Sequence, residues 1–162
     1  MREEETFVVP PLGGQSAEPP EGGTTNHIER LKLACQNAGL RMTHQRMEIF
    51  REVAQTDEHP DADTILKRVR ERMPTISHDT VYRTLSSLED MGLISRVDPV
   101  CGRARYDANS DAHHHFICTE CGCIADVYLN DEIPLPEGIE NLGRVESLHL
   151  QIRGMCHNCK NN

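Results

Sequence analysis

The sequence contains no tryptophan, and only three tyrosines and three phenylalanines occur among its 162 residues. With 37% hydrophobic residues the core is expected to be modest, and small cores commonly gain stability from a metal or a second subunit. No apolar run approaches the ~20 residues that a membrane-spanning helix needs. The first residues, MREEETFVVPP, lack the basic start and apolar segment of a signal peptide. We therefore expect a cytoplasmic protein that makes no membrane contact.

An excess of basic residues, the usual sign of a nucleic-acid-binding protein, is also missing, because the formal net charge is −9. The acids are unevenly distributed, however. Residues 1–25 carry one base and five acids, and residues 101–162 carry five bases and nine acids. Residues 26–100 are nearly balanced, with eleven bases and twelve acids. A local basic face in this middle segment remains compatible with the composition.

Seven cysteines in a reducing compartment indicate metal ligands or redox chemistry rather than disulfides. Four of them form two CxxC pairs, Cys118–Cys121 and Cys156–Cys159, and four thiolates suit the tetrahedral coordination of a structural zinc. A thioredoxin-like redox centre is less compatible with the sequence, because the pair is duplicated and no βαβ pattern surrounds it. Cys35 is expected in a helix core and Cys101 at a hairpin tip. Cys123 is expected to be a buried strand residue, with competition for the zinc as the alternative.

Apolar residues recur at helical spacing in four segments between residues 28 and 91. Thr43, Asp61 and Ser77 can cap three of these helices, and Pro74 and Gly92 are expected to end two of them. Two short strands, LISRV and RARYD, then flank the turn DPVCG. Helices followed by a hairpin are the pattern of a winged helix-turn-helix.

After residue 108 the segments HHFIC, CIADVYL and ESLHLQIRG are predicted strands, with at most a short helix near residues 137–143. The predicted fold class is α+β. It comprises a Pro-, Gly- and Glu-rich disordered extension over residues 1–25, a winged helix-turn-helix domain over residues 26–108, and a small α/β domain with a three-stranded sheet over residues 109–162.

Histidines and acids surround the first CxxC pair. His113 and His115 are two residues apart in a predicted strand, so their side chains share one face while His114 points to the other. Asp107 ends the preceding strand and Asp126 lies in the following one. Nitrogen and carboxylate ligands without thiolate suit Fe(II) or Mn(II), although they also suit zinc. A solvated histidine cluster is the alternative, and the residues alone do not decide between the two.

The ordered motifs SHDTVYRTLSSLEDMGLI, RYD, HHHFICTECG and GMCHNC resemble the ferric uptake regulator (Fur) family of metal-dependent repressors. The resemblance covers roughly residues 27–160. It implies a winged-helix DNA-binding domain, a dimerisation domain, structural zinc at the two CxxC pairs and a regulatory metal site. The implied regulatory ligands are His59, Asp107, His113, His115 and Asp126.

The acidic ligands indicate a branch of the family. Iron sensors usually carry glutamate at the positions of Asp107 and Asp126, whereas the peroxide-sensing branch, PerR, usually carries aspartate at both. The chain is similar to that branch, in which Fe(II) or Mn(II) acts as co-repressor. There, Fe(II) with peroxide leads to oxidation of a ligand histidine and release from DNA. By position, His59 and His113 are the candidates for this oxidation.

The resemblance also implies a homodimer that binds a palindromic double-stranded DNA operator through the helix over residues 78–91. A tyrosine ring can contact a thymine methyl group, and arginine can reach guanine. The residues expected at the DNA are Arg41, Gln45, Arg46, Ser77, Thr80, Tyr82 and Arg83.

Two other functions remain open. The first is an iron- or manganese-responsive repressor of the same family without peroxide sensing. The second is a non-haem metal enzyme that uses the histidines and aspartates. An enzyme needs an open coordination position and a substrate pocket, and five protein ligands leave little room for either.

Overall fold

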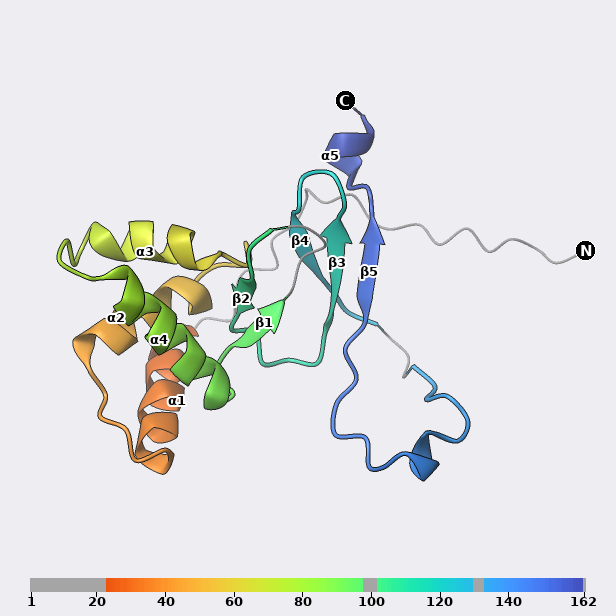
Figure 1. Cartoon of the computed structure of the whole chain (residues 1–162), viewed down its shortest axis with the longest axis horizontal. Coiled ribbons are helices and arrows are strands. Elements are labelled where there is room, and N and C mark those ends of the chain that lie inside the picture. The colour runs from red at the N-terminus through yellow and green to blue at the C-terminus, as the bar shows by residue number, and fades with distance from the viewer. Residues whose placement is uncertain (1–22, 98–101, 130–132, 162) are drawn as a thin grey trace, which may run out of the picture.

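The computed structural model describes residues 23–97, 102–129 and 133–161. Four helices precede a hairpin and a second, three-stranded sheet (Figure 1). The elements are α1 (Gly23–Asn37), α2 (His44–Ala54), α3 (Ala62–Arg70), α4 (His78–Asp90), β1 (Ser95–Val97), β2 (Arg105–Asp107), β3 (His114–Cys118), β4 (Ile124–Val127), the 3₁₀ helix η1 (Ile139–Asn141), β5 (Gln151–Gly154) and α5 (His157–Lys160). None of the described helices is long and apolar enough to cross a bilayer.

The first helix begins earlier than expected. Residues 1–22 of the expected disordered extension lie outside the described residues, but residues 23–25 belong to α1. The turn expected over residues 98–102 also lies outside the described residues, except for Gly102. The short helix expected near residues 137–143 is present as η1, whereas α5 had no sequence prediction.

The three predicted N-caps are confirmed, each with extended backbone. Thr43 accepts a hydrogen bond from the backbone N–H of Arg46 at 3.2 Å. Asp61 accepts one from Thr64 at 2.7 Å, and Ser77 accepts one from Thr80 at 3.1 Å. These side chains satisfy backbone donors that have no partner within the first helical turn, which fixes where α2, α3 and α4 begin.

The helix ends agree less closely with the sequence prediction. Gly92 has a φ of +66°, and its N–H donates to the carbonyl of Glu89 at 2.8 Å, so it ends α4 in the left-handed conformation that glycine favours. In contrast, α3 ends at Arg70, four residues before Pro74. The segment between them continues as turns, in which Met73 N–H donates to the carbonyl of Val69 at 2.8 Å.

The helices pack around one apolar core, to which the hairpin contributes Tyr106. Cys35 is buried in this core, as expected from its position in the helical pattern. The largest side chains that are fully buried there are Leu31, Ile49, Phe50, Ile65, Leu85 and Leu88. This helical part, followed by the antiparallel β1–β2 hairpin, has the predicted winged helix-turn-helix arrangement.

The second sheet has the strand order β4-β3-β5. β3 pairs antiparallel with β4 and parallel with β5, and β5 is shorter than the predicted strand over residues 146–154. A small apolar cluster of Val97 from β1, Ile117 from β3 and Ile124 from β4 packs the hairpin against this sheet. The hairpin therefore lies between the helices and the three-stranded sheet (Figure 1).

The loop before α3 is attached to β2 by three hydrogen bonds. The N–H of Tyr106 donates to the carbonyl of Pro60 at 3.1 Å. The Arg105 guanidinium donates to the carbonyls of Glu58, at 2.8 Å, and of His59. As a result, the loop that carries His59 is held beside the strand that ends at Asp107.

The cap of α4 provides a test of the fold. Ser77→Ala removes the oxygen that accepts the N–H of Thr80, and we expect the free energy of unfolding to fall by about 1 kcal/mol. Urea denaturation of the zinc-loaded protein would measure this loss. Ser86→Ala, at an exposed position of the same helix, is the matched control and should change the value by less than about 0.5 kcal/mol. Equal losses in the two variants would contradict a capping role.

Candidate metal centres

The five expected regulatory ligands lie together. The loop between α2 and α3 supplies His59, the end of β2 supplies Asp107, and β3 with its preceding residue supplies His115 and His113. Asp126 lies in β4, opposite His115 in the antiparallel register. The helical part of the chain and the three-stranded sheet therefore both contribute side chains to one cluster.

The ligand atoms of this cluster are in close contact. His113 Nε2 lies 2.9 Å from Asp107 Oδ2 and 3.0 Å from His115 Nε2. His59 Nε2 lies 2.9 Å from Asp126 Oδ1. His115 Nε2 connects the two groups, at 3.6 Å from Asp107 Oδ2 and 3.8 Å from Asp126 Oδ1. This arrangement directs three nitrogens and two carboxylate oxygens into one small volume.

Three of these buried atoms have no hydrogen-bond partner: His59 Nε2, Asp107 Oδ2 and Asp126 Oδ1. The ion-pair distances above are short, yet the atoms do not have the geometry of hydrogen bonds. Burying a polar atom without a partner is costly, and native proteins rarely do so. A divalent cation bound between these lone pairs would remove that cost, so the five residues fit a metal ion.

The outer nitrogens of two histidines are already occupied. His59 Nδ1 donates to the carbonyl of Asp57 at 3.0 Å, and His113 Nδ1 donates to the carbonyl of Asp111 at 2.7 Å. A proton on Nδ1 leaves Nε2 with its lone pair, which is the form that binds a metal. The backbone therefore selects the tautomer that the cluster needs.

His59 also has an unusual backbone conformation. Its φ is +50°, and among the described residues it is the only non-glycine with a positive φ. This left-handed conformation is unfavourable for a side chain with a Cβ atom and persists where neighbouring contacts enforce it. The hydrogen bond from Arg105 to the His59 carbonyl is such a contact.

Both acidic side chains are held in the ionised form. Burial raises the pKa of Asp126, but contacts with His59 and Asn109 outweigh it and bring this pKa to about 2. Burial also raises the pKa of Asp107, but His115 and the backbone N–H of Asn109 outweigh it and lower that pKa. Burial lowers the pKa of His59, but the Asp126 and Asp107 carboxylates and the Asp57 carbonyl together outweigh it and raise that pKa overall.

His114 does not belong to the cluster. Its Nδ1 accepts a hydrogen bond from the N–H of Leu150 at 3.2 Å, on the other face of β3. This agrees with the alternation expected from the sequence. By contrast, no prediction from the sequence covered Asn109, which contacts both Asp107 and Asp126. The only signal was its spacing, because an aspartate often accepts the N–H two residues further along the chain.

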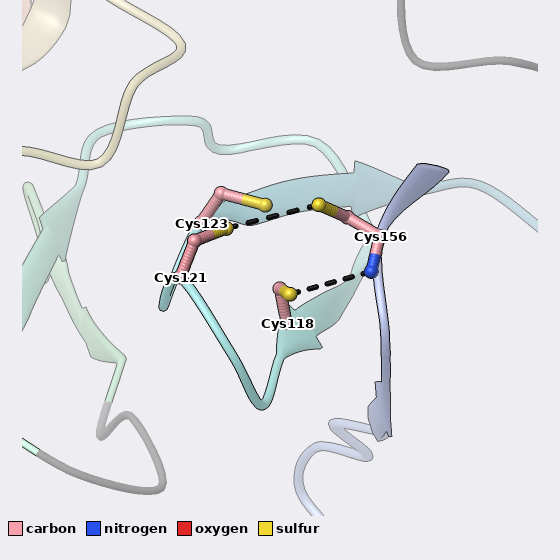
Figure 2. Close-up of side chains that lie close together, drawn as sticks. All are labelled: Cys118, Cys121, Cys123 and Cys156. Carbon is pink, nitrogen blue, oxygen red and sulfur yellow. Dashed lines mark hydrogen bonds between the residues drawn. The ribbon is translucent and has the colours of Figure 1, made fainter. Parts of the chain in front are cut away.

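A second cluster consists of thiols at the ends of β3 and β5 (Figure 2). The Sγ atoms of Cys118, Cys121, Cys123 and Cys156 all lie within 4.8 Å of one another. Cys121 Sγ and Cys156 Sγ are 3.7 Å apart, close to the separation of about 3.8 Å that follows from tetrahedral coordination with Zn–S bonds of ~2.3 Å. The parallel register that pairs Cys118 with Gly154 brings the two CxxC segments together.

The prediction that Cys123 is a buried strand residue is wrong. Cys123 is half-buried and lies just before β4, with its thiol beside those of Cys121 and Cys156 (Figure 2). The reason is the tight turn after Cys118, in which the Cys118 N–H donates to the Cys123 carbonyl at 2.9 Å. Cys101 lies outside the described residues.

Cys159 lies in α5, and its thiol also interacts with the cluster. Contacts with Cys156 and then Cys121 raise the pKa of Cys159 to about 12. The backbone N–H groups of Cys121 and then Cys156 lower the pKa of Cys118 to about 6. Five thiols, rather than the expected four, are therefore available where zinc needs four ligands.

The expected DNA-contacting residues lie on or before α2 and α4. Tyr82 is 40% exposed and stacks on the ring of His78, so it is not a core residue. Arg83 is exposed and forms an ion pair with Asp79 at 3.0 Å. Ser77 and Thr80 bond to each other at the start of α4. Residues 41 and 45 are exposed, and residue 46 is half-buried.

Comparison with known proteins decides the family. The model of the ferric uptake regulator family matches residues 37–152. The chain belongs to this family. Its members are metal-responsive transcription regulators rather than enzymes, so the alternative of a non-haem metal enzyme is excluded.

Relatives from two branches match the chain. It is 42% identical to ferric uptake regulation protein 1 of Mycolicibacterium fortuitum over 95 residues, a match that spans 57% of this chain and 57% of that protein. It is 30% identical to the peroxide-responsive repressor PerR of Staphylococcus epidermidis over 141 residues, which cover 83% of this chain and 91% of that protein.

A solved structure supports the fold. The Campylobacter jejuni peroxide stress regulator superposes with a TM-score of 0.61 at 26% identity, covering 82% of this chain and 98% of that chain. Similarity alone therefore links the chain both to a ferric uptake regulator and to peroxide regulators, and it does not select one of these two branches of the family.

Zinc content can resolve the role of the fifth thiol. Cys118→Ser should lose zinc, because Cys118, Cys121 and Cys156 are common to the close cluster and to the two CxxC pairs. Cys123→Ser and Cys159→Ser should each keep stoichiometric zinc, because each leaves these three thiols and one more, whereas the double variant leaves only three thiols and should lose it. Metal analysis after dialysis against a chelator would measure this, with Cys35→Ala in the helical core as control. Loss of zinc from Cys159→Ser alone would mean that Cys123 cannot act as a ligand.

Proposed function

We propose that this chain is a homodimeric transcriptional repressor with Fe(II) or Mn(II) as co-repressor and zinc as a structural metal. The observation that carries this proposal is that five side chains from both parts of the chain converge, and that three of their buried ligand atoms have no hydrogen bond. His59 and Asp107 come from the helical part and its hairpin, and Asp126 comes from the sheet. Three nitrogens and two carboxylate oxygens suit Fe(II) or Mn(II) better than a soft metal.

The proposed role of the metal is conformational. A cation bound to all five ligands joins the helical part to the three-stranded sheet and favours one relative orientation. When two orientations exchange, a ligand that binds one of them better shifts the population toward it. The DNA-competent orientation is the one in which the ligands converge, so metal binding and DNA binding strengthen each other.

Dimerisation would be supported by the exposed edge of the second sheet. Within the described residues, β5 pairs only with β3 and has a free edge. Large apolar side chains are also exposed in the segment that contains η1 and β5: Leu135, Leu142, Val145, Leu148, Leu150 and Met155. Exposed apolar side chains concentrated in one segment are a common feature of interaction sites. A two-fold dimer would present two α4 helices to a palindromic operator in the cytoplasm.

We further propose that the regulatory site senses hydrogen peroxide. Aspartate at both carboxylate positions, rather than glutamate, supports the peroxide-sensing branch. His59 and His113 contribute Nε2 atoms beside these carboxylates and are the proposed targets. In the oxidation, one oxygen atom of hydrogen peroxide is inserted into a ring C–H bond of histidine, and the peroxide is reduced to water. The modified ring binds metal less well, and the repressor leaves DNA.

The DNA contact can be tested with Arg83→Ala. A bidentate arginine–guanine contact contributes about 1–3 kcal/mol of discrimination, so operator affinity should fall about 5- to 150-fold. Fluorescence anisotropy with Mn(II) and a palindromic duplex selected from random DNA would measure it. Lys67→Ala, an exposed site on α3, is the charge-matched control. Equal effects of both variants, or binding that does not depend on Mn(II), would contradict the proposal.

The peroxide reaction can be tested by mass spectrometry. After Fe(II) loading and one equivalent of peroxide, the peptides that contain His59 or His113 should gain the mass of one oxygen atom. His114 is an internal control one residue away, because it lies on the other face of β3. Mn(II)-loaded protein should remain unmodified.

The same experiment distinguishes the alternative. If neither histidine gains oxygen and DNA binding persists after peroxide, the chain is an iron- or manganese-responsive repressor without peroxide sensing. The regulatory metal site would then stand, and only the sensing step would be wrong.

A further inference from the structure

Asn109 lies in the segment between β2 and β3, at the point where the chain passes from the hairpin to the second sheet. Its backbone N–H and both polar ends of its side chain form hydrogen bonds with residues of β2, β4 and the neighbouring segments. Its backbone N–H donates to Asp107 Oδ1 at 2.8 Å. Its side-chain N–H₂ donates to Asp126 Oδ2 at 2.8 Å and to the Tyr128 hydroxyl at 2.7 Å. Its side-chain oxygen accepts the N–H of Asp111 at 3.0 Å.

The two carboxylates are bound in the same manner. In each, Asn109 occupies one oxygen, and the other oxygen has no hydrogen bond and points toward the histidines. A carboxylate fixed by one oxygen presents the other in a defined direction, which lowers the entropy lost when a metal binds. The side-chain amide can only donate from its nitrogen, and this matches the ionised form of Asp126.

We propose that Asn109 is a positioning residue that sets the direction of both metal-binding carboxylates and so couples metal binding to the orientation of the two parts of the chain. This inference rests on the proposed regulatory site. Asp107 belongs to the hairpin, whereas Asp126 belongs to the second sheet. Asn109 is the residue whose hydrogen bonds connect them, so its side chain holds the orientation in which the ligands converge.

The proposal predicts which contact each substitution removes. Asn109→Ala keeps the backbone N–H to Asp107 but deletes the donor to Asp126. Asn109→Asp has nearly the same shape, but places a carboxylate oxygen against the carboxylate of Asp126. Loss of a group that orients a metal ligand typically lowers metal affinity about 10- to 100-fold. We expect a loss of this size for both variants, with the larger loss for Asn109→Asp.

Isothermal titration of zinc-loaded protein with Mn(II) would measure this affinity. A second readout is the visible absorption of Co(II) in the same site, which reports ligand geometry and should shift in Asn109→Ala. Ser110→Ala is the matched control, because residue 110 is exposed and adjacent. Zinc content and the urea midpoint should be unchanged in all variants, which separates positioning from a general loss of structure.

Asp126→Ala separates failure of the positioning role of Asn109 from failure of the proposed regulatory metal site. If Asp126→Ala lowers Mn(II) affinity but both Asn109 variants stay within twofold of the unmodified protein, the positioning role is wrong and the site stands. If Asp126→Ala also leaves the affinity unchanged, the regulatory site itself is wrong. A weakened affinity with a shifted Co(II) spectrum in Asn109→Ala, and neither change in Ser110→Ala, is the result that the proposal requires.

Discussion

The burial of lone pairs without hydrogen bonds at the proposed regulatory cluster is the constraint on which the rest of the structure depends. His59 Nε2, Asp107 Oδ2 and Asp126 Oδ1 are buried without hydrogen bonds. Without a cation these atoms are costly to keep buried, because each has lost hydration and forms no hydrogen bond. A bound cation would remove that cost and hold the helical part against the sheet. The stability of the contact between the two parts would therefore depend on metal occupancy.

Hydrogen bonds to the outer atoms of these side chains, which face away from the cluster, hold the inner atoms in place. Backbone carbonyls bind the outer nitrogens of His59 and His113, and Arg105 holds the left-handed backbone at His59. Asn109 connects the outer oxygens of Asp107 and Asp126. Because these contacts are formed by the protein alone, a metal would meet ligands that are already oriented. The strained φ of His59 indicates that some stability is given up for this arrangement.

The thiol cluster has a different role, because it lies within one part of the chain. Parallel pairing of β3 with β5 brings the two CxxC segments together, and a tetrahedral metal there would fasten the C-terminal segment to the sheet. Among the described residues the apolar cluster at this sheet is small, with Val97, Ile117 and Ile124, so a bound metal would add substantially to the stability of the sheet. The two candidate metal centres would thus serve folding and the proposed regulation separately, although their ligands alternate along the sequence.

Local patterns in the sequence determined the helix caps and the strand β3, which carries His115 and directly follows His113. Caps depend on contacts three residues apart, and strand alternation depends on neighbours, so both can be predicted without a fold. The α+β class and the winged helix followed from the order of the predicted helices and strands, and the proposed regulatory ligands followed from the resemblance to the ferric uptake regulator family. Only the tertiary structure placed Cys123 among the thiols, gave His59 its positive φ and brought Asn109 against Asp126. These features depend on how separate elements pack, and no local spacing encodes that geometry.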